Sequence, residues 1–434
     1  MRNHHGRPRS RAPALLALAA SAPLAQAMDF SWAPFAKVET RMYDNVRGVS
    51  DRNVRQNAEA AWGFDTGGGV NLKAQSETLT SELLPRFNFR RFVIGDNLDA
   101  DEYQVAFNND WLQERYALGL DVSYIRDSTL TNEFDETGAF RVDVTNRDSV
   151  LLNPTAIWFM NDRTAVNGGF FYNDVSYVDA EGTGFVDYEY KQGTAGINHR
   201  WRDNATVFGN FYLSEFQAAD DGNRLNGNQE SKTRSYSGMA GMTWQWDPTL
   251  ETTGAVGWIA SDLEFFDTAL ALVLTPAPAI VVLSTPAEAS ASGPLAQVNI
   301  RKTFDTLVAR FDYSRQVSPS GRGSQSRADR LALNVEKRLS PQFSVVFVGT
   351  YDIRSTEAEN IGAGTGTAAV LNRDYAELLG SVRYRINQEW SVSATYRHGY
   401  RQSTNLNFTD SAHTNVFLLA VNFNGLPNPF NPGF

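Results

Sequence analysis

Charged residues in the last third of the chain recur at the spacing of a β-strand, in which every second side chain points the same way. The twelve that share one face are Arg301, Arg310, Arg330, Arg338, Arg383, Arg385, Arg397, Arg401, Asp312, Glu336, Asp352 and Glu377. Because the arginines outnumber the carboxylates, a low-dielectric channel lined by this face would attract anionic solutes or sugar polymers. The same residues would also suit a structural ladder of arginine–carboxylate pairs between strands, and the two roles are compatible.

Aromatic residues fall on the equivalent faces elsewhere, among them Phe171, Phe208, Tyr212 and Tyr375. Aromatic rings at such positions could stack against sugar rings, or they could simply fill space beneath a loop. The sequence leaves both interpretations open.

Strict alternation of apolar and polar residues indicates the elements that carry these side chains. In residues 343–354, Phe343, Val345 and Phe347 share one face, whereas Ser344 and Asp352 lie on the other. Segments of this kind, about ten residues long, are typical of strands with lipid on one side and water on the other. No run of about 18 apolar residues follows the N-terminal region, so only a closed barrel could cross a bilayer.

The pattern predicts an all-β fold, a transmembrane antiparallel up-and-down β-barrel of about eighteen strands. Sixteen is the alternative, because Gly67, Gly68 and Gly69 could mark a turn or a bulge. The predicted strands lie near 34–45, 58–73, 82–93, 102–110, 115–127, 149–160, 164–176, 188–201, 205–216, 233–246, 250–262, 295–303, 306–316, 327–339, 342–354, 373–386, 389–401 and 413–423.

Connections between the predicted strands alternate between short and long, as in outer-membrane barrels with periplasmic turns and surface loops. Short polar turns occur at, for example, Asp203 and Pro248, which places both chain ends in the periplasm. The predicted long loops are 127–148, 179–187, 217–231, 265–294, 318–325, 355–372 and 402–412. The Ala/Pro-rich insertion at 269–294 is expected to be either a plug in the lumen or a surface loop.

Tryptophans lie within a few residues of the predicted periplasmic strand ends, where an aromatic girdle would meet the lipid headgroups. They are Trp111, Trp158, Trp201, Trp244, Trp246 and Trp390. The alternative, tryptophans in the core of a soluble β-sandwich, does not explain why one face of nearly every strand stays polar.

The first 27 residues resemble a secretory signal, with arginines followed by the apolar run 12–20 and a small-residue cleavage site ending at Ala27. The chain is therefore divided into a signal peptide at 1–27, a barrel at 28–424 and a C-terminal periplasmic tail at 425–434. Without the signal, 35 basic residues stand against 49 acidic ones, which disfavours nucleic acid as a partner. With no cysteine and few histidines, neither a metal site nor a cofactor is predicted.

Several runs carry a resemblance to a known family: residues 126–138 (RDSTLTNEFDETG), 173–177 (NDVSY), 184–188 (GFVDY) and 43–46 (YDNV). With these runs the chain resembles outer-membrane proteins of the β-barrel porin 2 type. The resemblance implies a barrel over the whole mature chain, an association with exopolysaccharide or exosortase gene clusters, and a role in polysaccharide export. The insertion at 269–294 and the tail after 424 depart from the family pattern, and the tail leaves open whether Phe423 or Phe434 is read by the insertion machinery.

The sequence thus predicts a monomeric conduit in the outer membrane of a Gram-negative cell, exporting exopolysaccharide or another large polar or anionic solute. A diffusion or solute-specific porin is the alternative, and a closed structural or adhesion barrel is the third possibility. Expected partners are outer-membrane lipid, the barrel-assembly machinery and a periplasmic polysaccharide-export protein on the short turns. The histidines His199, His398 and His413, the last two near Ser403 and Ser411, match no hydrolase motif, so no enzyme is predicted.

Overall fold

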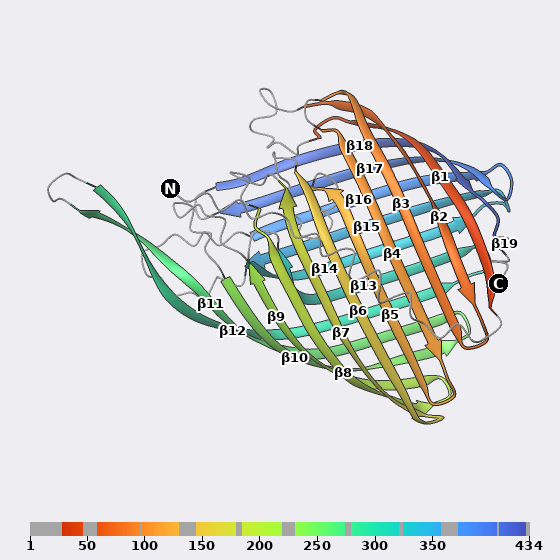
Figure 1. Ribbon diagram of the computed structural model, residues 1–434, viewed down its shortest axis with the longest axis horizontal. Helices are drawn as coiled ribbons and strands as arrows, with labels where there is room; N and C mark the ends of the chain where they lie inside the picture. Colours follow the sequence, from red (N-terminus) through yellow and green to blue (C-terminus); the bar gives the residue numbers. More distant parts are fainter. Residues whose placement is uncertain are drawn as a thin grey trace.

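The computed structural model shows a single antiparallel sheet rolled into a barrel (Figure 1). It describes residues 28–46, 59–95, 98–129, 145–178, 185–218, 231–273, 279–320, 324–356, 372–405 and 408–430. The signal predicted at 1–27 lies outside these residues. In the described part of the chain, no helix is long and apolar enough to cross a membrane.

The strands follow one another around the barrel in chain order. Their bounds are β1 (Asp29–Tyr43), β2 (Ala61–Gln75), β3 (Leu79–Ile94), β4 (Ala100–Leu112), β5 (Tyr116–Ser128), β6 (Asn146–Asn161), β7 (Thr164–Val178), β8 (Tyr188–Arg202), β9 (Ala205–Ala218), β10 (Ser231–Asp247), β11 (Leu250–Val273), β12 (Ala279–Thr303), β13 (Leu307–Ser320), β14 (Ser324–Arg338), β15 (Phe343–Thr356), β16 (Asn372–Arg385), β17 (Trp390–Asn405), β18 (Phe408–Asn424) and β19 (Asn428–Phe430).

Pairing between β1 and β18 closes the ring, from Phe35 opposite Asn424 to Tyr43 opposite Val416. Each strand from β2 to β18 pairs antiparallel with its neighbour in sequence. The closed eighteen-stranded antiparallel barrel confirms the predicted fold class. The short β19 adds a further pairing, opposite residues 30–32 at the start of β1, so part of the tail predicted at 425–434 belongs to the sheet.

The sixteen-stranded alternative is wrong, because Gly67, Gly68 and Gly69 pair inside β2 with residues 35–37 of β1. At Gly69 the missing side chain is required for packing. A Cβ there would lie 2.6 Å from Cζ of Phe35, so the phenyl ring occupies the space above the glycine.

Three predicted long loops, at 265–294, 318–325 and 402–412, are largely strand in the structure. The alternation that predicts strands disappears there because both faces of a hairpin beyond a lipid-facing band meet water. Backbone hydrogen bonding does not need that alternation, so the ladders continue through the Ala/Pro-rich insertion and through the two more polar segments.

The insertion at 269–294 extends the β11–β12 hairpin, whose backbone pairing continues to Val273 opposite Ala279. Figure 1 shows this hairpin projecting beyond the ends of the other strands. The insertion predicted as a lumen plug or a surface loop is therefore mostly a paired ribbon that points away from the barrel.

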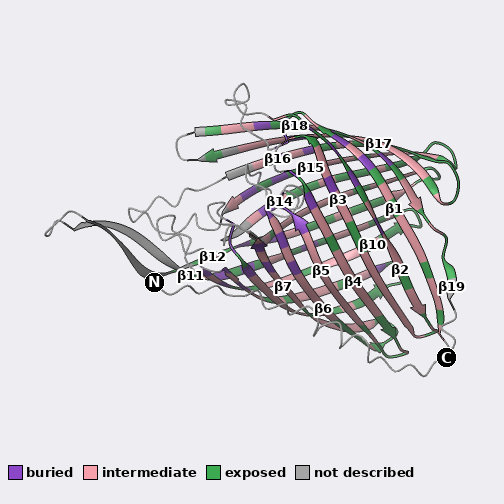
Figure 2. Ribbon diagram, turned by 45° about the horizontal axis from the view of Figure 1, so that its top comes forward, coloured by how far each residue is buried: buried purple, intermediate pink, exposed green. Residues whose placement is uncertain are grey.

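Figure 2 marks buried, intermediate and exposed residues along the strands, and toward the end of β15 exposure alternates between the two faces of the sheet. On β15, Phe347, Tyr351 and Ile353 are each at least 38% exposed, whereas Asp352 between them is 5% exposed. Exposed apolar side chains on one face with polar side chains on the other is the pattern of a barrel that meets lipid outside and water inside. We call the face with Asp352 the inner face.

Candidate functional site: the inner face of the barrel

Strand register determines which side chains share the inner face, because directly opposed residues point the same way. Arg330 lies opposite Asp352, and Asp352 lies opposite Tyr375. Tyr375 in turn lies opposite Arg401, and Glu377 lies two residues further along the same strand. Followed through β12 to β17, the register places all twelve charged residues from the sequence analysis on this one face.

Only some of these charges are paired. Arg397 Nε lies 2.8 Å from Glu377 Oε2, and Tyr375 donates a hydrogen bond to the same carboxylate. Asp312 accepts a hydrogen bond from Asn299, and Arg330 interacts electrostatically with Asp352.

The unpaired arginines form what we call the arginine face. All its members are solvent-exposed, and in the described part of the chain none makes an ion pair. They are Arg301, Arg310, Arg338, Arg383 and Arg385. The alternation also puts Arg354 on the inner face, 4.0 Å from Asp352, although it is absent from the twelve predicted residues. The outcome is a surplus of exposed positive charge along β12 to β17.

A second charged group, which the alternation pattern did not predict, lies on β1 to β4. Arg41 contacts Glu39 Oε1 at 2.7 Å and also pairs with Asp65. On the other side of Asp65, Arg90 Nε lies 3.3 Å from Asp65 Oδ1.

The chain of pairs continues from Arg90 to Glu102, at 3.2 Å, and from Glu39 to Lys37, at 2.6 Å. The side chains of Glu39, Arg41, Asp65 and Arg90 are all less than 10% exposed. We call the six residues Lys37, Glu39, Arg41, Asp65, Arg90 and Glu102 the strut cluster. Its positive and negative charges balance, so it ties four strands together without creating a strong field.

The six predicted girdle tryptophans all lie beside the short turns, on the outer face. Trp158, Trp201 and Trp246 are each more than 50% exposed, and the rings of Trp244 and Trp246 stack with centroids 5.3 Å apart. Trp32, 40% exposed near the start of β1, joins them and was missed because the predicted first strand began after it. Exposed indoles at one level are the expected arrangement for a headgroup interface.

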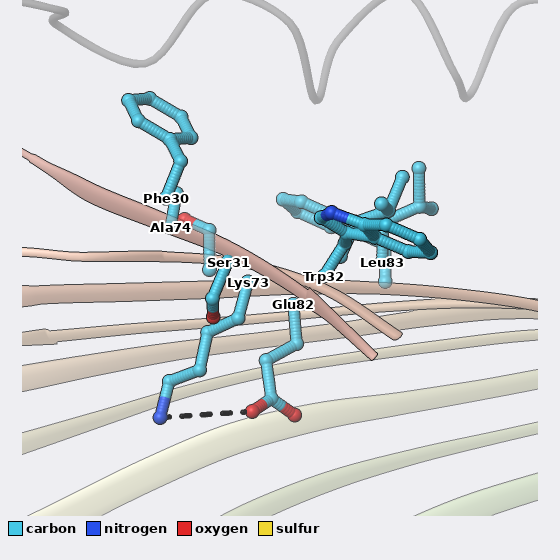
Figure 3. A pocket seen from close by; sticks show the side chains of 10 residues that line it. Phe30, Ser31, Trp32, Lys73, Ala74, Glu82 and Leu83 are labelled. Atoms are coloured by element: carbon cyan, nitrogen blue, oxygen red, sulfur yellow. Dashed lines mark ion pairs between the residues drawn. The ribbon is translucent and has the colours of Figure 1, made fainter. Parts of the chain in front are cut away.

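A shallow apolar hollow of about 640 Å³ lies beside this level on β1 to β4. Figure 3 shows Trp32 and Leu83 on one side of the sheet, with Lys73 and Glu82 on the other, where their charged atoms are 3.9 Å apart. Trp32 lies opposite Leu72, which lies opposite Leu83, so these three share the outer face. The hollow is therefore chiefly a feature of the outer surface.

The histidines considered for catalysis lie on the outer face among hydrogen-bonding neighbours. His398 Nδ1 is 2.8 Å from Asn415 Oδ1, and its ring stacks on that of His413. His199 Nδ1 lies 3.0 Å from Thr164 Oγ1. Among the described residues, no group of three or more potential ligands could hold a metal ion.

No protein-family model matches the chain, and no curated protein matches it, so the resemblance to the β-barrel porin 2 type stays a prediction. The chain is similar to several solved structures. The siderophore receptor PiuA from Acinetobacter baumannii has 9% identity and a TM-score of 0.45, covering 93% of this chain and 82% of that one. Pseudomonas aeruginosa OpdQ has 9% identity and a TM-score of 0.43, covering 92% and 99%.

The Ferric-Catecholate import receptor Fiu from E. coli, in its open form, has 10% identity and a TM-score of 0.44, covering 90% of this chain and 81% of that chain. Likenesses at this level add nothing to the architecture that the chain's own strand pairing defines.

Proposed function

We propose that the protein is an outer-membrane conduit for large polar, anionic solutes. The observation that carries this proposal is the arginine face, five exposed inner arginines without an ion pair in the described part of the chain. Positive charge in a low-dielectric channel raises the local concentration of anions and speeds their entry. A purely structural ladder would instead leave its arginines paired, as in the strut cluster.

Export of an exopolysaccharide is the specific form of this function that we favour. It is supported by the resemblance to the β-barrel porin 2 type and by the charge of the inner face. In this proposal the signal is cleaved near Ala27, the barrel-assembly machinery inserts a monomer into the outer membrane of a Gram-negative cell, and a periplasmic polysaccharide-export protein docks on the short turns. The barrel carries solute and has no catalytic role.

The test is ion selectivity of the purified mature protein in planar lipid bilayers. The double variant Arg383→Ser, Arg385→Ser should lower the anion-to-cation permeability ratio about twofold or more while the barrel still assembles, because lumen substitutions tune selectivity with little effect on stability. Lys337→Ser, a cation removed from the outer face near the same end of the barrel, is the matched control. Unchanged selectivity in the double variant would contradict the proposal.

A diffusion porin for small anions is a second candidate, because the same five arginines would attract small anions equally well. The two functions differ in whether transport requires a periplasmic partner protein. A porin conducts and exchanges small anions at full rate alone, whereas a polymer exporter moves its substrate only with a periplasmic protein bound to the short turns. Polymer flux into vesicles, with and without periplasmic extract, separates them.

A further inference from the structure

Between the two charged walls lies an inner surface of another kind, on β7 to β10. Most of its larger side chains are amides, hydroxyls and aromatic rings, with Val175 and Met239 among them. The structure describes every residue of these four strands, and Arg200, near a short turn, is the only charged residue on their inner face. The charged side chains Glu189, Lys191 and Glu215 belong to the opposite face.

Near the short-turn end of this wall, the tip of the Phe208 ring lies over Gly241. A Cβ on Gly241 would be 2.6 Å from Cζ of Phe208, so the ring occupies the place of a side chain on the neighbouring strand. The two residues are directly opposed in the β9–β10 ladder. Phe208 is half-buried on the inner face, so part of its ring remains accessible from the lumen, and an apolar ring surface fits the C–H face of a pyranose.

Amides converge one step further along the wall. Asn167 and Asn210 flank Gly196: a Cβ on that glycine would meet Asn167 Oδ1 at 2.9 Å and would also clash with Asn210. Asn198 donates a hydrogen bond to Asn167 Oδ1 over 3.1 Å. Each amide has a carbonyl acceptor and two N–H donors, so capacity remains after this one bond. Donor and acceptor side by side match vicinal sugar hydroxyls.

The same alternation of ring and amide continues toward the long-loop end. Thr194 lies opposite Tyr212, and Phe171 lies opposite Gln192. Gln192 donates to the hydroxyl of Tyr190 over 3.1 Å, and the rings of Tyr190 and Phe171 pack edge to face with centroids 6.0 Å apart. Rings and amides therefore follow one another along the strands and do not form a single isolated pocket.

We propose that this inner wall of β7 to β10 is a binding track for pyranose rings, and that the solute is an acidic glycan whose carboxylates are drawn by the arginine face. The inference rests on the proposed function and narrows its solute class. A polyanion without sugar rings needs only the arginines, and a neutral glycan needs only the track. The two surfaces together fit a polymer with both features.

The experiment measures binding to the mature protein in detergent micelles by calorimetry, which does not require an open lumen. Three probes separate the two surfaces: an oligogalacturonate octamer, maltooctaose and poly-L-glutamate. Phe208→Ala should weaken both sugars about threefold to tenfold and leave poly-L-glutamate unchanged, because one aromatic contact is lost. Asn210→Leu should act in the same direction. Phe211→Ala, one ring removed from the outer face of the same strand, is the matched control and should change nothing.

The arginine double variant Arg383→Ser, Arg385→Ser should weaken oligogalacturonate and poly-L-glutamate but not maltooctaose. If Phe208→Ala and Asn210→Leu bind both sugars as the control does while the arginine variant still loses poly-L-glutamate, the sugar track is refuted and the anion conduit stands. If wild-type protein binds none of the probes and shows no anion preference in bilayers, both proposals fail.

Discussion

Two inner walls of this barrel use arginine and carboxylate side chains in opposite ways. In the strut cluster on β1 to β4, Asp65 lies between Arg41 and Arg90, and the carboxylate is 3% exposed. On the arginine face, Arg383 and Arg385 are exposed and unpaired among the described residues. The difference teaches that arginine content alone does not identify a solute path. An arginine that contacts carboxylates on neighbouring strands holds those strands together. An arginine without a carboxylate partner contributes its positive charge to the lumen.

The largest expected effect comes from breaking the strut cluster. Asp65→Asn leaves Arg41 and Arg90 buried without their shared counter-charge, and removing one partner of a buried pair costs about 3–5 kcal/mol. We expect loss of the folded band that migrates faster unheated than boiled on a denaturing gel, or a large fall in the urea midpoint of whatever assembles.

Glu336→Gln is the matched carboxylate control on the other wall. Its side chain is exposed, so the free energy of unfolding should change by about 0.5 kcal/mol or less. Equal stability losses in the two variants would mean that the walls do not differ as described.

The next largest effect is that of salt concentration, which should weaken the action of the arginine face but not the stabilisation by the strut cluster. The Debye length falls from about 10 Å at 0.1 M salt to about 3 Å at 1 M, so the anion preference due to the exposed arginines should largely disappear over that range. The stability difference between wild type and Asp65→Asn should persist, because buried pairs are screened much less. Reversal potentials and urea midpoints at both salt concentrations measure the two effects. Salt-independent selectivity would contradict a role for the arginine face.

A smaller change in anion preference is expected at Arg397, which pairs with Glu377 although it lies on the inner wall that carries the unpaired arginines. Glu377→Gln releases Arg397 and should raise the anion preference. Arg397→Ser should lower it less than the Arg383/Arg385 double variant, since Glu377 already neutralises part of this charge. Reversal potentials across a salt gradient provide the measurement, and a fall in anion preference for Glu377→Gln or a rise for Arg397→Ser would refute the assignment.

The smallest expected effect is that of single cysteine substitutions that report the orientation of the barrel in the membrane. Neither the substitutions nor the labelling should change function. A cysteine at Glu288, on the projecting β11–β12 hairpin, should react on intact cells with a reagent that cannot cross the membrane. A cysteine at Asp203, in the turn between β8 and β9, should react only after the cells are opened. The natural chain has no cysteine to confuse the result. The reverse pattern would invert the barrel.

Alternation in the sequence was enough to locate all eighteen barrel strands, because each meets lipid on one face and water on the other. The same alternation placed Arg383 and Asp352 on a common face. It could not reveal the strut cluster, because that cluster depends on the β1–β2 and β2–β3 registers, which place Asp65 opposite both Glu39 and Arg90. Nor could it follow β11 and β12 into the Ala/Pro-rich insertion, where no lipid imposes a pattern.

The contact between Phe208 and Gly241 also could not be predicted. A phenylalanine and a glycine on separate strands have no sequence relationship until the β9–β10 register brings them together. Two further residues could have been predicted from the sequence. Arg354 lies two residues after Asp352 and so shares its face, and Trp32 would join the girdle if the first predicted strand began a few residues earlier.

The seam between β1 and β18 has a consequence for how the protein is made. Its pairs, such as Phe35 with Asn424, join the first and the eighteenth strands, so the ring cannot close until β18 has been synthesised. Contacts between such distant positions form slowly, because the entropy of closing the intervening chain must be overcome first. Until then the first and last strands present open edges that can pair with other chains. A chain cut short before β18 would therefore remain an unclosed sheet and not a narrower pore.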